Sequence, residues 1–170
     1  MSPEQKSLYI DQLNRTPHQL FEASLVDARP ICILDTNILL DLWVFHDPHV
    51  EAILKALESH QIRLIGHVET FCEFADVISR TMFKLTSDEQ NALLMRWLKT
   101  AEVVTEPLSN ARFCKDTDDD KFFELAVMSG ARFLVSKDKK VLKARGKAKK
   151  FGIEVMRRDD FSQWLANAHN

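Results

Sequence analysis

Short apolar segments alternate with helical patterns along this chain, and this alternation is the feature that most constrains its fold. Residues 31–34 form an apolar run of strand length that stops abruptly at polar Asp35. Further segments of strand character lie at 62–65, 102–105, 132–135 and 152–156. Parallel strands need crossover connections, which are usually helices. We therefore predict a three-layer α/β/α fold around a central, mostly parallel sheet of about five strands.

Capping residues and prolines mark where the helices begin and end. Helical spacing of apolar residues, or a capping signal, predicts helices at 38–44, 47–60, 68–82, from 87 onward, from the acidic run 116–120 to Gly130, and after Asp159–Asp160. Ser2-Pro3 and Thr16-Pro17 predict two further helices over 3–14 and 17–27. We therefore divide the chain into an N-terminal helical extension, residues 1–29, and an α/β domain, residues 30–170.

Composition excludes several classes of protein. The 170 residues can bury one core, and a net charge of −2 means that any basic surface for nucleic acid must be local. Three cysteines, an odd number at wide spacing, favour reduced thiols over a disulfide framework or a zinc site. No apolar run reaches the length of a membrane span, and the N-terminus is too polar for a signal peptide. We expect a soluble, cytoplasmic protein without a membrane partner.

Acidic residues occupy the positions where an open parallel sheet places its functional site. Asp35 and Asp138 directly follow predicted strands, and the carboxyl ends of parallel strands lie at one edge. Glu73 on a polar helix face and Asp119 at a helix start can reach the same edge if the connections are right-handed. Converging carboxylates repel one another unless a divalent cation neutralises them, and oxygen ligands suit Mg²⁺ or Mn²⁺. Such ions support phosphodiester hydrolysis.

Four motifs, in this order along the chain, resemble those of PIN domains. They are Ile33-Leu34-Asp35-Thr36-Asn37, the stretch 70–80 around Glu73, the acidic stretch 116–126, and the stretch 130–138 that ends in Asp138. The resemblance covers about residues 30–165 and is strongest to the branch of toxin components of toxin–antitoxin systems. The N-terminal extension is unusual for that branch, and Ser136-Lys137 replaces its commoner threonine–glycine pair.

The resemblance implies a set of site residues. The catalytic and metal-binding residues would be Asp35, Glu73, Asp119 and Asp138. Asn37 and Ser136 would be polar neighbours of the scissile phosphate. Asp116 would orient one of the metal ligands without binding the metal itself. Asp119 fits the spacing of the family to Ala126 and Gly130 better than Asp118 or Asp120.

Simpler interpretations of the same acids stay open. Asp35 could be a turn residue or a helix cap, and Glu73 could be a solvated residue of its helix face that pairs with Arg80 through neighbours. The acidic run could be a solvated helix start. It is not a calcium-binding EF-hand loop, because Lys121 and Val127 stand where that loop needs glycine and glutamate.

A basic segment follows Asp138. Residues 137–150 contain eight cations, with Asp138 as their only opposing acid, and a solvated face is the simplest interpretation. Because the segment begins beside a candidate catalytic acid, we predict instead that it holds RNA across the site. The residues expected to contact RNA are Lys137, Lys139, Lys140, Lys143, Arg145 and Lys147.

The predicted function is a metal-dependent endoribonuclease that uses Mg²⁺ or Mn²⁺ on single-stranded or loop RNA. The resemblance further implies a 5′-phosphate product, inhibition by a small antitoxin protein, and a homodimer. The alternative is a degenerate PIN module that binds RNA or a protein partner without cleaving.

Overall fold

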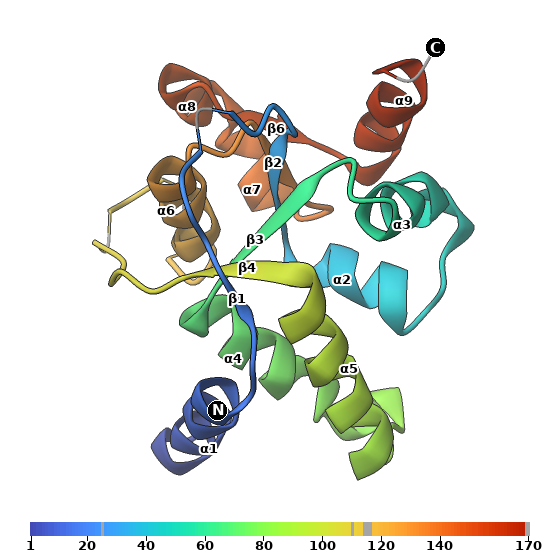
Figure 1. Cartoon of the computed structure of the whole chain (residues 1–170), viewed down its shortest axis with the longest axis vertical. Coiled ribbons are helices and arrows are strands. Elements are labelled where there is room, and N and C mark those ends of the chain that lie inside the picture. The colour runs from blue at the N-terminus through green and yellow to red at the C-terminus, as the bar shows by residue number, and fades with distance from the viewer. Residues whose placement is uncertain (25, 110, 114–116, 169–170) are drawn as a thin grey trace.

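The fold is built on one sheet whose strands all run parallel. In the computed structural model of the chain, which describes residues 1–24, 26–109, 111–113 and 117–168, six strands have the order β1-β4-β3-β2-β5-β6 (Figure 1). Their bounds are β1 Gln19–Leu20, β2 Ile31–Leu34, β3 Arg63–His67, β4 Ala101–Val104, β5 Phe133–Val135 and β6 Glu154–Met156. The predicted three-layer α/β fold with a parallel sheet is confirmed.

Helices connect the strands and cover both faces of the sheet. The α-helices are α1 Pro3–Arg15, α2 Thr36–Trp43, α3 Glu51–Glu58, α4 Val68–Ile78, α5 Ser87–Thr100, α6 Asp120–Ser129, α7 Lys139–Lys143, α8 Arg145–Ala148 and α9 Arg158–Ala168. Short 3₁₀ turns are η1 Pro48–Val50, η2 Thr81–Phe83 and η3 Lys149–Phe151. No helix within these described residues is long and apolar enough to cross a membrane.

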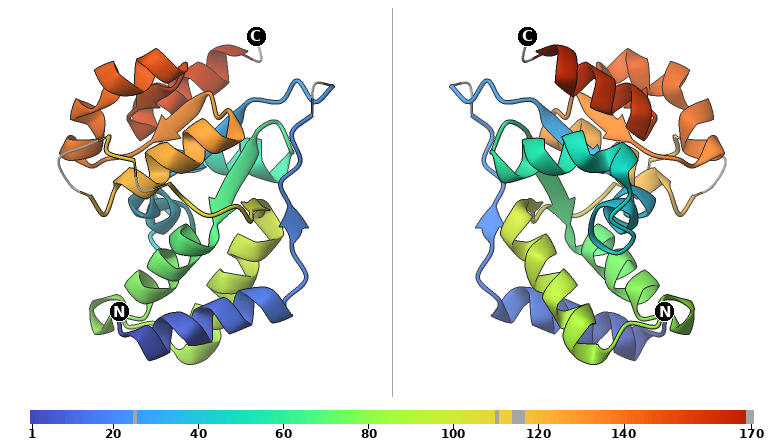
Figure 2. Two further views of the ribbon diagram at one scale, coloured as in Figure 1. Left: turned by 90° about the vertical axis from the view of Figure 1, so that its left-hand side faces the viewer. Right: turned by 90° about the vertical axis from the view of Figure 1, so that its right-hand side faces the viewer.

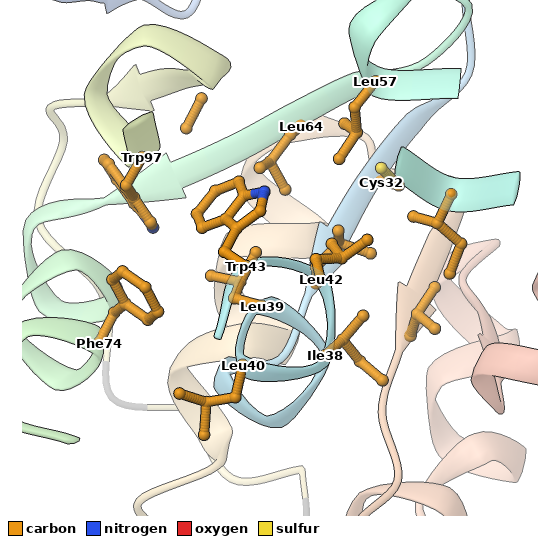
Figure 3. Close-up of a cluster of buried hydrophobic side chains, with 14 of the residues drawn as sticks. Cys32, Ile38, Leu39, Leu40, Leu42, Trp43, Leu57, Leu64, Phe74 and Trp97 are labelled. Atoms are coloured by element: carbon orange, nitrogen blue, oxygen red, sulfur yellow. The ribbon is translucent and has the colours of Figure 1, made fainter. Parts of the chain in front are cut away.

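Alternate strand residues feed two separate apolar layers. Cys32 and Leu34 of β2 pack with α2, α3, α4, α5 and α9, whereas Ile33 between them packs with α6, α7 and α8 on the other face (Figure 1). The first layer is the larger, and α2 lies within it, surrounded by Leu57, Leu64 and Phe74 (Figure 3). Because α2 begins at the end of β2, this packing fixes the position of Asp35.

The predicted helix over 17–27 is wrong. The Thr16 hydroxyl, expected to open that helix, instead donates to the Gln12 carbonyl oxygen at 2.8 Å and closes α1. The next residues extend and form β1, which pairs with β4, and the Phe21 amide donates to the Val103 carbonyl at 2.9 Å. Hydrogen bonds to an otherwise open sheet edge outweigh the local start signal.

The N-terminal extension therefore completes the sheet. From α1 it runs along the edge of the molecule to the start of β2 (Figure 2). Its helix packs on α4, where Lys6 forms an ion pair with Glu69 at 2.8 Å, and Leu13 is buried in the larger apolar layer.

Candidate active site

Asp35 lies at the centre of the carboxyl edge of the sheet. The neighbouring strands β2 and β5 are in register, so Asp35 and Ser136 follow them side by side. Oδ2 of Asp35 accepts hydrogen bonds from the Ser136 hydroxyl at 2.5 Å and from the Asn37 amide at 2.7 Å. Two neutral donors thus hold the Asp35 side chain in one orientation. Only 5% of the residue is exposed to solvent.

The charge of Asp35 is costly where the fold places it. Burial raises its pKa from 3.8 to about 6, and the nearby negative charge of Glu73 adds to this, while the hydrogen bonds from Ser136 and Asn37 oppose the rise. Asp35 occupies the N-cap position of α2 but accepts no capping hydrogen bond. A helix cap therefore does not explain this aspartate.

Glu73 faces the site from α4. Its Oε1 accepts a hydrogen bond from the Thr36 hydroxyl at 2.6 Å, and its Oε2 forms an ion pair with the Lys121 ammonium group of α6. Arg80 forms its ion pair with Asp76, at 3.1 Å, and not with Glu73. Glu73 is therefore half-buried between the starts of α2 and α6, and the interpretation as a solvated partner of Arg80 is wrong.

The aspartates at the start of α6, residues 118–120, differ in how far they are buried. Asp119 is half-buried at the N-cap position, and Asp118 is exposed. Asp120 is buried, and its Oδ1 accepts a hydrogen bond from the Phe113 amide at 2.8 Å. Asp116, a predicted member of the site, lies outside the described residues.

Asp138 caps the helix that opens the basic segment. Its Oδ1 accepts a hydrogen bond from the Lys140 amide at 2.6 Å, and its own amide donates to the Ser136 hydroxyl oxygen at 2.9 Å. The backbone of Asp138 is therefore linked to Asp35 through Ser136, while its carboxylate stabilises the start of α7.

A polar hollow of about 760 Å³ adjoins Glu73 on the side of α1. Lys121 lies between the hollow and the candidate site, because it lines the hollow and forms the ion pair with Glu73. Asp118 and Asp120 line the hollow, whereas Asp119 is not among its lining residues. Asp118, Asp119 and Asp120 therefore do not all face the same part of the surface.

The structure brings together part of the predicted site. Asp35 and Glu73 lie near each other, with Thr36, Asn37 and Ser136 as their hydrogen-bond donors. Within the part of the chain that the structure describes, no three acidic, histidine or cysteine side chains converge closely enough to hold a metal ion together. The roles of Asp119 and Asp138 stay predictions.

The residues that do meet fit a divalent cation by their chemistry. Asp35 and Glu73 offer carboxylate oxygens only, which suits Mg²⁺ or Mn²⁺. Burial raises the pKa of Asp35 most, and the repulsion from Glu73 that adds to the rise is the kind that a bound cation relieves. The Lys121 ammonium group shows that positive charge is accepted beside Glu73.

The basic segment forms an outer surface next to this edge. Val141, Ala144 and Ala148 turn inward, and the cations of α7, α8 and η3 are exposed. Predicted RNA-binding residues also have partners within the protein, Lys137 and Lys147 among them. The Lys137 ammonium group donates to Asp41 at 2.7 Å, and that of Lys147 donates to the Arg112 carbonyl oxygen. Their binding to RNA stays a prediction.

Sequence reasoning missed four residues around the site. Thr36 and Lys121 stand inside the motifs that carried the family resemblance, so their positions were visible although their roles were not. Asp41 and Arg158, which form an ion pair at 2.5 Å, lie 117 residues apart and share no motif. Only the fold could bring them together.

Comparison with known protein families shows to which family the chain belongs. The sequence model of the family described as "PIN domain" matches residues 32–140, more than half of the chain. The chain belongs to the PIN-domain family. PIN domains are usually nucleases and typically use divalent metal ions, although some members are degenerate. The match includes Asp35, Glu73, Asp119 and Asp138 and ends inside the basic segment. No curated protein matches the chain.

Proposed function

We propose that this PIN domain is a metal-dependent endoribonuclease. The observation that carries the proposal is the pair of carboxylates, Asp35 and Glu73, at the carboxyl edge of the sheet, with Asp35 buried and its pKa raised to about 6. Buried carboxylates with a strongly raised pKa occur mainly at functional sites, and the family is one of nucleases.

Asp35 and Glu73 would hold Mg²⁺ or Mn²⁺, and Asp119 and Asp138 would complete the site. When bound, such an ion supplies an activated water and neutralises charge that develops on the phosphate. The chain's own contribution is orientation. Ser136 and Asn37 hold Oδ2 of Asp35. Thr36 holds Oε1 of Glu73, and the Lys121 ammonium group holds Oε2.

RNA is the proposed substrate class because of the exposed cations beside Asp138. An RNA strand that lies along α7 and α8 would cross the carboxyl edge of the sheet where Asp35 lies. The resemblance to toxin components supports a biological role as the toxin of a toxin–antitoxin pair, with a small antitoxin protein as partner and a homodimer as the assembly.

One observation favours a second function, that of an RNA-binding or protein-binding module without catalysis. Lys121 neutralises Glu73 from within the chain, and an ammonium group in this place competes with a metal ion. The two functions differ in one result, since only the nuclease converts RNA into shorter products in the presence of metal.

The test is cleavage of a mixed RNA by the purified protein. We expect cleavage with Mg²⁺ or Mn²⁺, loss of cleavage with a chelator, recovery with excess metal, and 5′-phosphate ends. Asp35→Asn should be inactive, whereas Asp76→Asn, which changes an acid one turn further along α4 that forms an ion pair with Arg80, should keep activity. Cleavage that persists in chelator, or in pure Asp35→Asn, would refute the proposal.

A further inference from the structure

A second buried carboxylate lies close to the candidate site. Asp41 is on α2, less than two turns after Asp35, and only 2% of it is exposed. Its Oδ1 accepts a hydrogen bond from the Lys137 ammonium group at 2.7 Å, and its Oδ2 accepts one from Nη1 of Arg158 at 2.5 Å. A buried carboxylate is tolerated when it is paired and hydrogen-bonded, so both cations support Asp41.

Arg158 joins three separate parts of the fold. It is the first residue of α9 and follows β6, which lies beside β5 in the sheet. Its Nη1 donates to Asp41 of α2 and also, at 2.5 Å, to Asp47, which caps η1. Arg158 therefore fixes α2 to the carboxyl edge of the sheet at the end where the candidate site lies.

Lys137 carries this fixation to the site itself. Its ammonium group is held by Asp41, and its backbone amide donates to Oδ1 of Asn37 at 3.1 Å. Lys137 stands between Ser136, whose hydroxyl binds Asp35, and Asp138, whose amide binds Ser136. The turn that presents Ser136 to Asp35 is thus held at Lys137 in two ways, through its side chain by Asp41 and through its backbone amide by Asn37.

We propose that Arg158 and Asp41 are positioning residues, which hold Lys137 and through it keep the turn 136–138 against Asp35. This inference rests on the proposed nuclease function and extends it beyond residues 32–140, the part that matches the family. It also assigns Lys137 to the architecture of the site, in addition to any binding of RNA.

The experiment compares the full chain with Arg158→Gln, Asp41→Asn, the conservative Arg158→Lys, and Arg157→Gln as a matched control at the exposed neighbouring arginine. Two quantities are measured below the melting temperature of every variant. One is amide hydrogen exchange at Lys137 and Asp138, with Leu134 in the buried strand β5 as an internal reference. The other is kcat and KM for RNA cleavage at saturating metal.

For Arg158→Gln and Asp41→Asn, we expect exchange at Lys137 and Asp138 to rise about tenfold more than at Leu134, because the turn is released while the strand is not. We expect kcat to fall about tenfold to a hundredfold with KM changed less than about twofold, since a misplaced site loses rate more than binding. Arg158→Lys should recover part of both effects, and Arg157→Gln should equal the wild type.

Equal increases of exchange at all three amides, with kcat retained, would show a general loss of stability and would overturn the positioning role. Unchanged protection at Lys137 and Asp138 would overturn it as well. A wild-type protein that does not cleave RNA would refute the proposed function, and the exchange data would still decide whether Arg158 and Asp41 hold the turn. The two failures are therefore distinguishable.

Discussion

Asp35 shows at the scale of one residue how this chain gives up stability for its site. A carboxylate with 5% exposure loses most of its hydration, and Glu73 adds repulsion, so the pKa rises to about 6. The hydroxyl of Ser136 and the amide of Asn37 recover only part of that loss. A residue kept under these conditions is better explained by a ligand that needs its charge than by packing.

Asp35→Asn should therefore stabilise the protein in chelator at neutral pH. The unfolded chain loses the Asp35 proton near pH 3.8 and the folded chain near pH 6. Stability contributed by the protonated form is thus present below pH 3.8 and is lost as the pH rises to about 6. The gain from Asn should reach roughly 1 to 3 kcal/mol at pH 7.5 and nearly vanish at pH 4.

Urea unfolding of both proteins at the two pH values measures this gain, with the exposed Asp11→Asn as control. A loss of stability in Asp35→Asn at pH 7.5 would show instead that the charged carboxylate supports the fold.

The acidic run allows a second comparison at the residue scale. Asp119→Asn should lower the cleavage rate far more than Asp118→Asn, because Asp119 is half-buried at the helix start whereas Asp118 is exposed and faces the hollow beside α1. Rates for the two single variants at saturating Mg²⁺ provide the measurement. The reverse ranking would move the metal-binding assignment by one residue.

At the scale of elements, local patterns predicted the parts of the fold that depend on one segment. The apolar runs of β2 and β5, each followed by a polar residue, located both strand ends, and Gly130 marked the end of α6 with its positive φ of 66°. The strand β1 escaped prediction because only its pairing with β4, far along the chain, makes it a strand. The same holds for Arg158, whose partners come from α2 and η1.

The basic segment yields a prediction for α7 and α8. Replacing Lys139, Lys143 and Arg145 by glutamine should weaken RNA binding and flatten its salt dependence by about two units of log–log slope, at ~0.7 for each phosphate that is no longer neutralised on a single strand. Turnover at saturating RNA should change little. Lys147 stays unchanged because its ammonium group holds the Arg112 carbonyl oxygen.

The matched control removes three exposed cations from other helices, Arg15, Lys55 and Lys99, so that the net charge changes equally. Affinity against salt is measured in the Asp35→Asn background to prevent cleavage. Equal slopes for the two triple variants would mean that the segment is only a solvated face.

At the scale of the whole molecule, the N-terminal extension and the sheet form one unit. The buried Arg63 of β3 binds Glu102 of β4 through two hydrogen bonds, at 2.9 and 2.5 Å, and donates to the carbonyl oxygen of Glu22 at 3.0 Å. One guanidinium group thus joins two neighbouring strands to the extension that covers their edge.

Arg63→Met should lower the free energy of unfolding by about 3 to 5 kcal/mol, because it leaves the buried Glu102 carboxylate without its partner. The double variant Arg63→Met/Glu102→Leu should recover most of this loss. Lys55→Met, which removes an exposed ion pair with Glu51, should cost less than about 1 kcal/mol. Urea unfolding tests all three, and a double variant as unstable as Arg63→Met would assign the loss to packing.

If Asp35 and Glu73 bind a divalent cation, the purified protein should bind Mn²⁺ through these two side chains. Electron paramagnetic resonance of free Mn²⁺ gives the affinity of the purified protein without any need for cleavage. We predict that the wild type binds Mn²⁺, that Asp35→Asn and Glu73→Gln each weaken binding at least about tenfold, and that Asp76→Asn does not. Equal Mn²⁺ affinity in the wild type, Asp35→Asn and Glu73→Gln would show that these two carboxylates do not bind the cation.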